Sequence, residues 1–368
     1  MTDFFQGIVT LLLFFLILGT VIVLHEFGHF AVARLLRIRV LEFGIGFPPR
    51  AKVLRDRGET LYTLNWLPIG GFVKLEGEDG DEADDPRSFT AQPLLAKVAV
   101  LAAGVVMNFA LAFVIFTGIT LSGDPAIGVY VPYVEPGSPA AAATLREGDV
   151  IERLDGEVFG AFGSVSLLEE LRSKAGHTVV LTVLRADGVR EELTAALRSP
   201  ADVKAGKGAL GIGRQGNPVA FRTTEDRIRY PVGDAIALGW DRTTSATVLI
   251  ARGVGQVLSD LVTKPTEAPG ASGPVGIATQ IGDVFWALGP LVTLYLVGVL
   301  SANLAVINII PLPPLDGGRI LVLLLKKVLG SRLSLRVERL TYLVGFALLF
   351  GFLIWVTAFD VIRGLGGG

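Results

Sequence analysis

The stretch that decides the fold runs from Phe4 to Leu35, FFQGIVTLLLFFLILGTVIVLHEFGHFAVARL. Its first part, Phe4 to Leu24, contains no Asp, Glu, Lys or Arg, and His25-Glu26-Phe27-Gly28-His29 follows at once. About 20 apolar residues in a helix are enough to cross the roughly 30 Å hydrocarbon layer of a bilayer. We therefore predict a membrane-spanning helix over residues 1–36, with three ionisable side chains near its inner end.

Three more stretches of similar length are free of Asp, Glu, Lys and Arg. They are Val98 to Ser122, Val284 to Leu315 and Leu340 to Phe359. Each predicts a spanning helix, with bounds of 94–122, 284–318 and 340–359. A cleaved signal peptide is the alternative for the first span. It is disfavoured because no basic residue precedes the apolar run and no small-residue cleavage site interrupts it before Arg34.

The composition agrees with a multi-pass membrane protein whose partner is the lipid bilayer. Of 368 residues, 51% are hydrophobic and 18% are charged, whereas soluble domains carry about a quarter charged residues. The net charge of −2 gives no basic surface for a nucleic acid, which excludes that class of partner. The chain has no cysteine, so disulfides and thiolate metal ligands are excluded, and a metal must bind to His, Asp or Glu.

Basic residues at the ends of the spans predict the orientation in the membrane. Arg34, Arg37 and Arg39 follow the first span, and a second basic group follows the third: Arg319, Lys326, Lys327, Arg332, Arg336 and Arg339. Short cytosolic loops carry an excess of Lys and Arg. We therefore expect residues 37–93 and the basic loop 319–339 to be cytosolic. Both termini, including the tail 360–368, and the long segment after the second span are expected to be extracytoplasmic.

Residues 123–200 read as a β-rich extracytoplasmic domain. Val129 to Val134 and Val179 to Leu184 are β-branched runs of strand length, and Ala186-Asp187-Gly188 fits a hairpin turn. The order of Ser138-Pro-Ala-Ala141 and Arg146-Glu-Gly-Asp-Val-Ile151 resembles a circularly permuted bacterial PDZ domain. Such a domain can bind a peptide C-terminus as an added strand. The alternative, given equal weight, is that it only props or occludes the entrance to a membrane site.

Two further segments have their own patterns. In residues 201–283, the residues Ile250, Val254, Val257, Leu258 and Leu261 recur at helical spacing, which predicts an amphipathic helix on the membrane or against the β-rich domain. Lys264 to Gly276 reads as an irregular connector.

In residues 37–93, strands are expected at Arg39 to Phe47, Thr60 to Leu64 and Gly71 to Leu75, in a small sheet that enters the membrane face. Asp79 to Asp85 is expected to be a solvated acidic excursion.

The chemistry is expected at the end of the first span. In a helix, His25 and His29 lie on one face, so both imidazoles can bind one zinc ion, and Glu26 can reach a water beside it. The alternative is a pair of buried, hydrogen-bonded histidines.

Asp316, the first charge after the uncharged third span, is the natural third ligand because that span also ends at the cytosolic side. The alternative for Asp316 is a helix-end acid facing water near Arg319. His177, in the β-rich domain, is expected to be an ordinary surface residue.

With these residues in view, the chain resembles the site-2 protease family, and specifically the bacterial RseP/RasP-type regulated intramembrane zinc metalloproteases. The resemblance is carried in order by four motifs: His25-Glu-Phe-Gly-His29, Pro68-Ile-Gly-Gly-Phe-Val-Lys74, Gly273-Pro-Val-Gly-Ile277 and Asn308-Ile-Ile-Pro-Leu-Pro-Pro-Leu-Asp-Gly-Gly318. It implies four transmembrane helices, a re-entrant β-hairpin over Arg39 to Leu75 and an inserted PDZ-like domain. Some relatives carry two PDZ domains in tandem, whereas this chain has room for one.

The resemblance also implies a site and a reaction. One zinc ion per chain would be held by His25, His29 and Asp316, with Glu26 as general base. Asn303 and Asn308 would touch substrate or shape the active site; the alternative for both is interhelical hydrogen bonding. The substrates would be single-span proteins of the bacterial cytoplasmic membrane, such as trimmed anti-sigma factors or remnant signal peptides, cut near the cytosolic face. Two other functions stay open: an inactive PDZ-bearing binding protein with a structural zinc, and a transporter that relays protons or metal ions.

Overall fold

The structure, a computed structural model, describes residues 2–56, 58–78, 85–163, 165–214, 216–264, 270–329 and 335–365. Most of the expected acidic excursion and the basic residue Arg332 lie outside these ranges. The chain forms two compact units. The helical unit consists of Met1–Phe116, Gly239–Asp283 and Tyr295–Gly368, and the β unit consists of Thr117–Leu238 and Val284–Leu294. Each unit is considered by itself.

Among the described residues, four helices are long and apolar enough to cross a membrane, as the sequence predicts. They are α1 (Thr2–Leu35), α2 (Leu94–Ser122), α8 (Pro290–Ile309) and α10 (Leu335–Leu365). Each contains one candidate span: Phe4–Leu35, Leu94–Ser122, Pro290–Ile309 and Leu340–Ile362. Large apolar side chains on these helices face outward, including Phe4, Leu12, Leu16, Leu343 and Leu348. Such a surface suits lipid rather than water.

The third span differs from the single helix expected over 284–318. The structure has α7 (Pro274–Leu288), a break at Gly289, then α8, and then a separate helix α9 (Asp316–Leu329). Proline lacks the backbone N–H that continues a helix, so Pro311, Pro313 and Pro314 end α8 and separate it from α9. Asp316 therefore begins a new helix instead of ending a span.

The expected loop at 319–339 is also corrected, because α9 occupies its first part. Ile320 and Leu323 pack against a buried cluster, while Lys326 and Lys327 lie in the last turn of the helix. This distribution makes α9 amphipathic, and the charges that suggested a loop belong to its polar face. Arg336 and Arg339 belong to the first turns of α10, and their side chains lie outside the described part.

A two-stranded sheet packs against the C-terminal half of α1. β1 (Val40–Arg55) and β2 (Leu61–Leu75) pair antiparallel, in two long strands where the sequence suggested three short ones. The first half of β1 pairs on one side with the end of β2 and on the other with its beginning; for example, Phe43 pairs with both Val73 and Tyr62. The sheet is held by a buried cluster on α1, α2 and both strands, with members Ala33, Ile38, Val40, Leu75, Phe89, Val100 and Leu101.

The segment expected to hold an amphipathic helix contains α6 (Val232–Thr263). Ala246 and Ile250 of α6 pack against Ala112 and Phe116 of α2 and Ala302 of α8, whereas Leu258 and Leu261 remain exposed. The apolar stripe thus covers helices of the helical unit along part of its length. The expected connector is shorter than predicted, because α7 already begins at Pro274 and residues 265–269 lie outside the described ranges.

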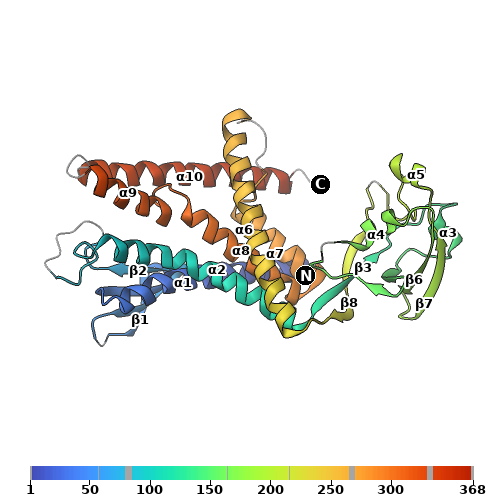
Figure 1. The fold of residues 1–368 in the computed structure, drawn as a ribbon, viewed down its shortest axis with the longest axis horizontal. Helices are drawn as coiled ribbons and strands as arrows, with labels where there is room; N and C mark the ends of the chain where they lie inside the picture. Colours follow the sequence, from blue (N-terminus) through green and yellow to red (C-terminus); the bar gives the residue numbers. More distant parts are fainter. Residues whose placement is uncertain are drawn as a thin grey trace. The chain divides into compact units, whose positions relative to one another are not determined.

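The β unit contains a six-stranded sheet with three short helices. Its strands are β3 (Asp124–Tyr130), β4 (Val150–Leu154), β5 (Glu157–Val158), β6 (Thr178–Leu184), β7 (Arg190–Ala196) and β8 (Ala220–Ile228). The order is β7-β6-β4-β3-β8, with β5 paired to β4, and all pairs are antiparallel. The helices are α3 (Pro139–Ala142), α4 (Leu167–Ser173) and α5 (Pro200–Lys204). Figure 1 labels β3, β6, β7 and β8 and the three helices of this unit.

This domain is larger than the expected 123–200. β8 pairs with β3 along Asp124 to Tyr130, and Ala209 and Leu210 belong to the buried core. The extension carries little hydrophobic signal because β8 is a mostly exposed edge strand with the polar sequence Ala-Phe-Arg-Thr-Thr-Glu-Asp-Arg-Ile. An edge strand of this kind does not show the alternation by which buried strands are predicted.

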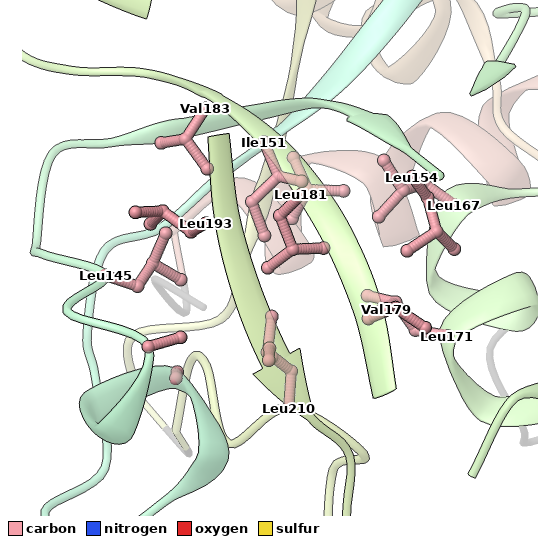
Figure 2. Close-up of a cluster of buried hydrophobic side chains, with 14 of the residues drawn as sticks. Leu145, Ile151, Leu154, Leu167, Leu171, Val179, Leu181, Val183, Leu193 and Leu210 are labelled. Atoms are coloured by element: carbon pink, nitrogen blue, oxygen red, sulfur yellow. The ribbon is translucent and has the colours of Figure 1, made fainter. Parts of the chain in front are cut away.

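The core of the β unit lies between its sheet and the short helices. Figure 2 shows Ile151, Leu181 and Val183 of the sheet together with Leu167 and Leu171 of α4. Beside this core, the Asp149 carboxylate accepts from the Arg185 guanidinium at 2.7 Å and from the Arg146 backbone N–H at 2.8 Å. The Arg-Glu-Gly-Asp motif found in the sequence thus fixes the turn that leads into β4.

Replacing Leu181 with Ala should destabilise the β unit by about 2–5 kcal/mol, because a fully buried side chain leaves a cavity. Val180→Ala is the matched control, since Val180 lies on the same strand with its side chain 38% exposed; its cost should stay near ~0.5 kcal/mol. Urea unfolding of the full-length protein in detergent, followed by proteolysis within the β unit, measures both. Equal effects of the two variants would contradict the assignment of the core.

Candidate metal centre

Two histidines of α1 form the first half of the site. His25 and His29 are one helical turn apart, so their side chains lie on the same face. Their Nε2 atoms are 3.1 Å apart, and the residues are only 5% and 6% exposed. The spacing that the sequence suggested therefore brings two imidazole nitrogens to one point at the interior of the helical unit.

Asp316 completes the group from a distant part of the chain. It is the first residue of α9, and its Oδ2 lies 3.1 Å from His25 Nε2 and 3.3 Å from His29 Nε2. The three ligand-type atoms lie within 4.8 Å of one another. The break between α8 and α9 places Asp316 at the start of a helix beside the imidazoles of α1. The structure thus brings together all three residues predicted as ligands.

The chemistry of these atoms fits a zinc ion. Asp316 Oδ2 is buried and accepts no hydrogen bond among the described residues, although two imidazole nitrogens face it. His29 Nδ1 lies 2.7 Å from the Val100 carbonyl oxygen, which places the ring proton on Nδ1 and a lone pair on Nε2. Electron pairs converging in an apolar interior repel one another unless a cation lies between them. Two imidazoles and a carboxylate are a common ligand set of catalytic zinc, with one position left open.

The other predicted residues lie at different distances from this point. Glu26 follows His25 on α1, is half-buried, and interacts electrostatically with His29, His25 and Asp316. Asn308, in the last turn of α8, has its Nδ2 3.5 Å from His25 Nε2. Asn303 is half-buried more than one turn earlier on α8 and makes no hydrogen bond to the ligands within the described residues. His177 is exposed in the β unit, as expected.

The comparisons with known proteins cover nearly the whole chain. The sequence profile of Peptidase family M50 matches residues 13–352. The chain belongs to this family. Three bacterial relatives are named as candidate zinc metalloproteases. That of Clostridium perfringens is 31% identical over 94% of this chain and 96% of its own length. That of Fusobacterium nucleatum is 31% identical over 96% and 98%, and that of Brucella suis 29% identical over 96% and 95%.

Membership of the M50 family agrees with the geometry of the site. The chain is a zinc metalloprotease of the membrane, and zinc is its metal. His25, His29 and Asp316 are the residues of the described part that fit it as ligands.

Helix α2 supports the ligand pair of this protease in a way that the sequence reading did not foresee. A Cβ on Gly104 would lie 2.5 Å from His29 Nε2 and 2.6–2.7 Å from the His25 ring. A Cβ on Gly28 of α1 would lie 2.5 Å from the Ala103 carbonyl oxygen. Both glycines therefore permit α1 and α2 to approach closely. The signal was present in the small residues Ala102-Ala103-Gly104, which mark helix contacts in membranes.

An ion pair connects the metal helix to the sheet. Arg319, one turn after Asp316 on α9, places a guanidinium nitrogen 2.6 Å from Glu78 Oε1, just after β2. Glu78 also accepts from the Leu75 backbone N–H at 3.1 Å. The alternative in which Asp316 is a water-facing acid beside Arg319 is therefore not favoured, because Arg319 pairs with Glu78 and Asp316 faces the imidazoles.

Gly104→Ala should weaken zinc binding by about ten-fold or more, which is the usual effect of disturbing the residues that support metal ligands. The added methyl group occupies space that both imidazole rings border. Gly7→Ala is the control, because a Cβ on Gly7 of α1 meets nothing within 4 Å. Elemental analysis of the purified proteins after equilibration with graded chelator measures the difference. Full zinc retention by Gly104→Ala would refute the close contact of α2 with the ligands.

Proposed function

We propose that this protein is an intramembrane endopeptidase of the RseP/RasP type that hydrolyses a peptide bond within the transmembrane segment of single-span membrane proteins. The observation that carries the proposal is the place of the ligand group. His25 and His29 lie inside the candidate span Phe4–Leu35, and Asp316 follows a second candidate span by a short proline-rich turn. Ionisable groups at such positions are costly in a membrane and generally serve function.

Different residues of the chain have different roles in the proposed hydrolysis. His25, His29 and Asp316 would hold the zinc ion, which when bound polarises a peptide carbonyl and acidifies a water molecule. Glu26 accepts the proton of the attacking water at its carboxylate and returns it to the nitrogen of the leaving amine. Asn308, whose amide lies beside His25, can donate a hydrogen bond to the substrate backbone. Asn303 is proposed only to shape the wall of the site.

The substrate must be extended before it can be cut, because a helix shields its own carbonyl groups. The β1–β2 sheet offers a partner for an extended segment. In the described pairing, Gly71–Leu75 of β2 and Arg50–Arg55 of β1 are the two outer segments. The first of these adjoins α1 just before the ligands, since Gly70 approaches Ile22 and Gly71 approaches Val23. We propose that an unwound substrate pairs with the Gly71–Leu75 edge.

The membrane and the orientation are part of the same proposal. We infer the bacterial cytoplasmic membrane, with the β1–β2 sheet and the metal site near the cytosolic face and the β unit outside. The support is the basic residues that follow the first and third spans. The β unit is proposed to act as a PDZ-like domain. Its support is the Ser138 cap of α3 and the Asp149 turn, which contain the motifs of the sequence resemblance.

Glu26→Gln should retain one zinc per chain and lose cleavage by a factor of about 10²–10⁴, because the amide cannot accept the proton of water. Zinc is measured by elemental analysis, and cleavage of a single-span model substrate is followed by mass spectrometry. Glu147→Gln, at an exposed position of the β unit, is the matched control and should cut normally. Zinc in both proteins with undiminished cleavage by Glu26→Gln would contradict the assigned base. Zinc without cleavage in the wild type, across a panel of single-span substrates, would favour a binding protein with a structural metal.

Proline substitution along the Gly71–Leu75 edge should lower cleavage while zinc content stays unchanged. Proline has no N–H to donate to an added strand. A scan through Gly71, Phe72 and Val73 tests this edge, and the same scan through Lys52, Val53 and Leu54 tests the other outer segment. Cleavage is measured with the same single-span substrate. If only the second scan lowered cleavage, substrate pairing would belong to β1, and if neither did, strand pairing would be wrong.

A further inference from the structure

The two ligand imidazoles turn their second ring nitrogens toward the same helix. His29 Nδ1 lies 2.7 Å from the Val100 carbonyl oxygen, and His25 Nδ1 lies 3.3 Å from the side-chain amide of Asn108. Val100, Gly104 and Asn108 recur every fourth residue, so they form one stripe along α2. The stripe has a polar atom at each end. In its middle lies Gly104, which has no side chain and therefore lies close to both rings.

A histidine that binds metal through Nε2 carries its proton on Nδ1, and that proton needs an acceptor. For His29 the acceptor is a backbone carbonyl, which the helix supplies whatever the side chain at Val100. For His25 the neighbouring group is a side chain, so the sequence decides whether an acceptor exists. Asn108 is the residue at that position.

The surroundings of Asn108 are closed. The residue is fully buried, and its Oδ1 has no hydrogen-bond partner among the described residues, while its Nδ2 faces His25 Nδ1. A half-turn of the terminal amide exchanges oxygen and nitrogen without changing its shape. In that orientation Oδ1 accepts the proton of His25 Nδ1, and the buried oxygen gains the partner it lacks.

We propose that Asn108 is a positioning residue of the metal centre: its side-chain oxygen accepts from His25 Nδ1 and so holds the lone pair of His25 Nε2 toward the zinc. The inference rests on the proposed ligand set of the protease. Separately, the Ser301 hydroxyl of α8 donates to the Asn108 backbone carbonyl at 2.8 Å, a contact between α8 and α2 that involves neither the Asn108 side chain nor an imidazole. Asn108 thus has its backbone tied to α8 and its side chain turned to α1.

The competing role for a buried asparagine in a helix bundle is a hydrogen bond that merely joins two helices. The two roles make opposite predictions for two variants of similar size. Asn108→Leu keeps the volume and removes the acceptor, whereas Asn108→Asp keeps the acceptor and adds a buried charge. A packing role tolerates leucine better than aspartate. A positioning role tolerates aspartate better than leucine, because a carboxylate accepts from Nδ1 and favours a cation nearby.

The experiment measures the affinity of the purified full-length protein for Zn²⁺ alone, by competition with a chromophoric chelator in detergent. Asn108→Leu should bind zinc about 10–100-fold more weakly than the wild type. Asn108→Asp should bind zinc more tightly than Asn108→Leu by at least the same factor. Ser301→Ala is the matched control: it removes a buried polar contact at the same helix crossing without touching either imidazole, and should leave the affinity nearly unchanged.

Absorption of the Co²⁺-loaded proteins provides a second readout, since the visible bands report ligand geometry. They should match the wild type in Asn108→Asp and differ in Asn108→Leu. Wild-type affinity in Asn108→Leu, equal losses in the leucine and aspartate variants, or an equal loss in Ser301→Ala would overturn the proposal. If Asn108→Leu does not fold, Asn108→Ala takes its place in the same comparison.

His25→Ala separates failure of this inference from failure of the proposed ligand set. Loss of zinc in His25→Ala with full affinity in Asn108→Leu rejects the role of Asn108 and leaves the ligands in place. Full affinity in His25→Ala rejects the ligand set itself, and with it the inference.

Discussion

The rest of the structure depends on one constraint: two imidazole nitrogens and a carboxylate oxygen converge in an apolar helix bundle. Their separations of 3.1–3.3 Å leave no space for water between them. Without a cation, three electron-pair donors at such distances in a low dielectric oppose one another. A zinc ion held by these three atoms would therefore also act as a structural link between α1 and α9.

Several features of the helical unit follow from the need to place that cation. The prolines after α8 break the helix so that Asp316 begins a new one beside the imidazoles of α1. Gly28 on α1 and Gly104 on α2 let the two helices approach so closely that the backbone of α2 lies next to the two imidazole rings. Arg319 and Glu78 then connect the same helix α9 to the β1–β2 sheet. The β1–β2 sheet and the His-His-Asp group are in this way connected by one set of contacts.

The sequence was sufficient for the four candidate spans, and it singled out the His-His-Asp group that the structure brings together, because these features depend largely on local patterns. Few structures are compatible with an uncharged run of about 20 residues or with two histidines spaced four residues apart. It was insufficient where tertiary context decides. The break of the third span, the helix α9 and the edge strand β8 depend on packing partners far away in the chain. The small residues around Gly104 indicate a helix contact without saying what it touches, and Asn108 gave no signal in itself, since an asparagine in a spanning helix has many uses.

The pairing of β3 with β8 has a consequence for how such a protein can change over time. Asp124, in the first strand of the six-stranded sheet, pairs with Ile228 in the last strand, so the segment that forms the sheet ends beside the point where it begins. An insertion with adjoining ends behaves as a cassette. It can be exchanged, duplicated or deleted without altering the distance that the flanking segments must bridge. The metal centre can thus persist unchanged while selection replaces the β-rich domain.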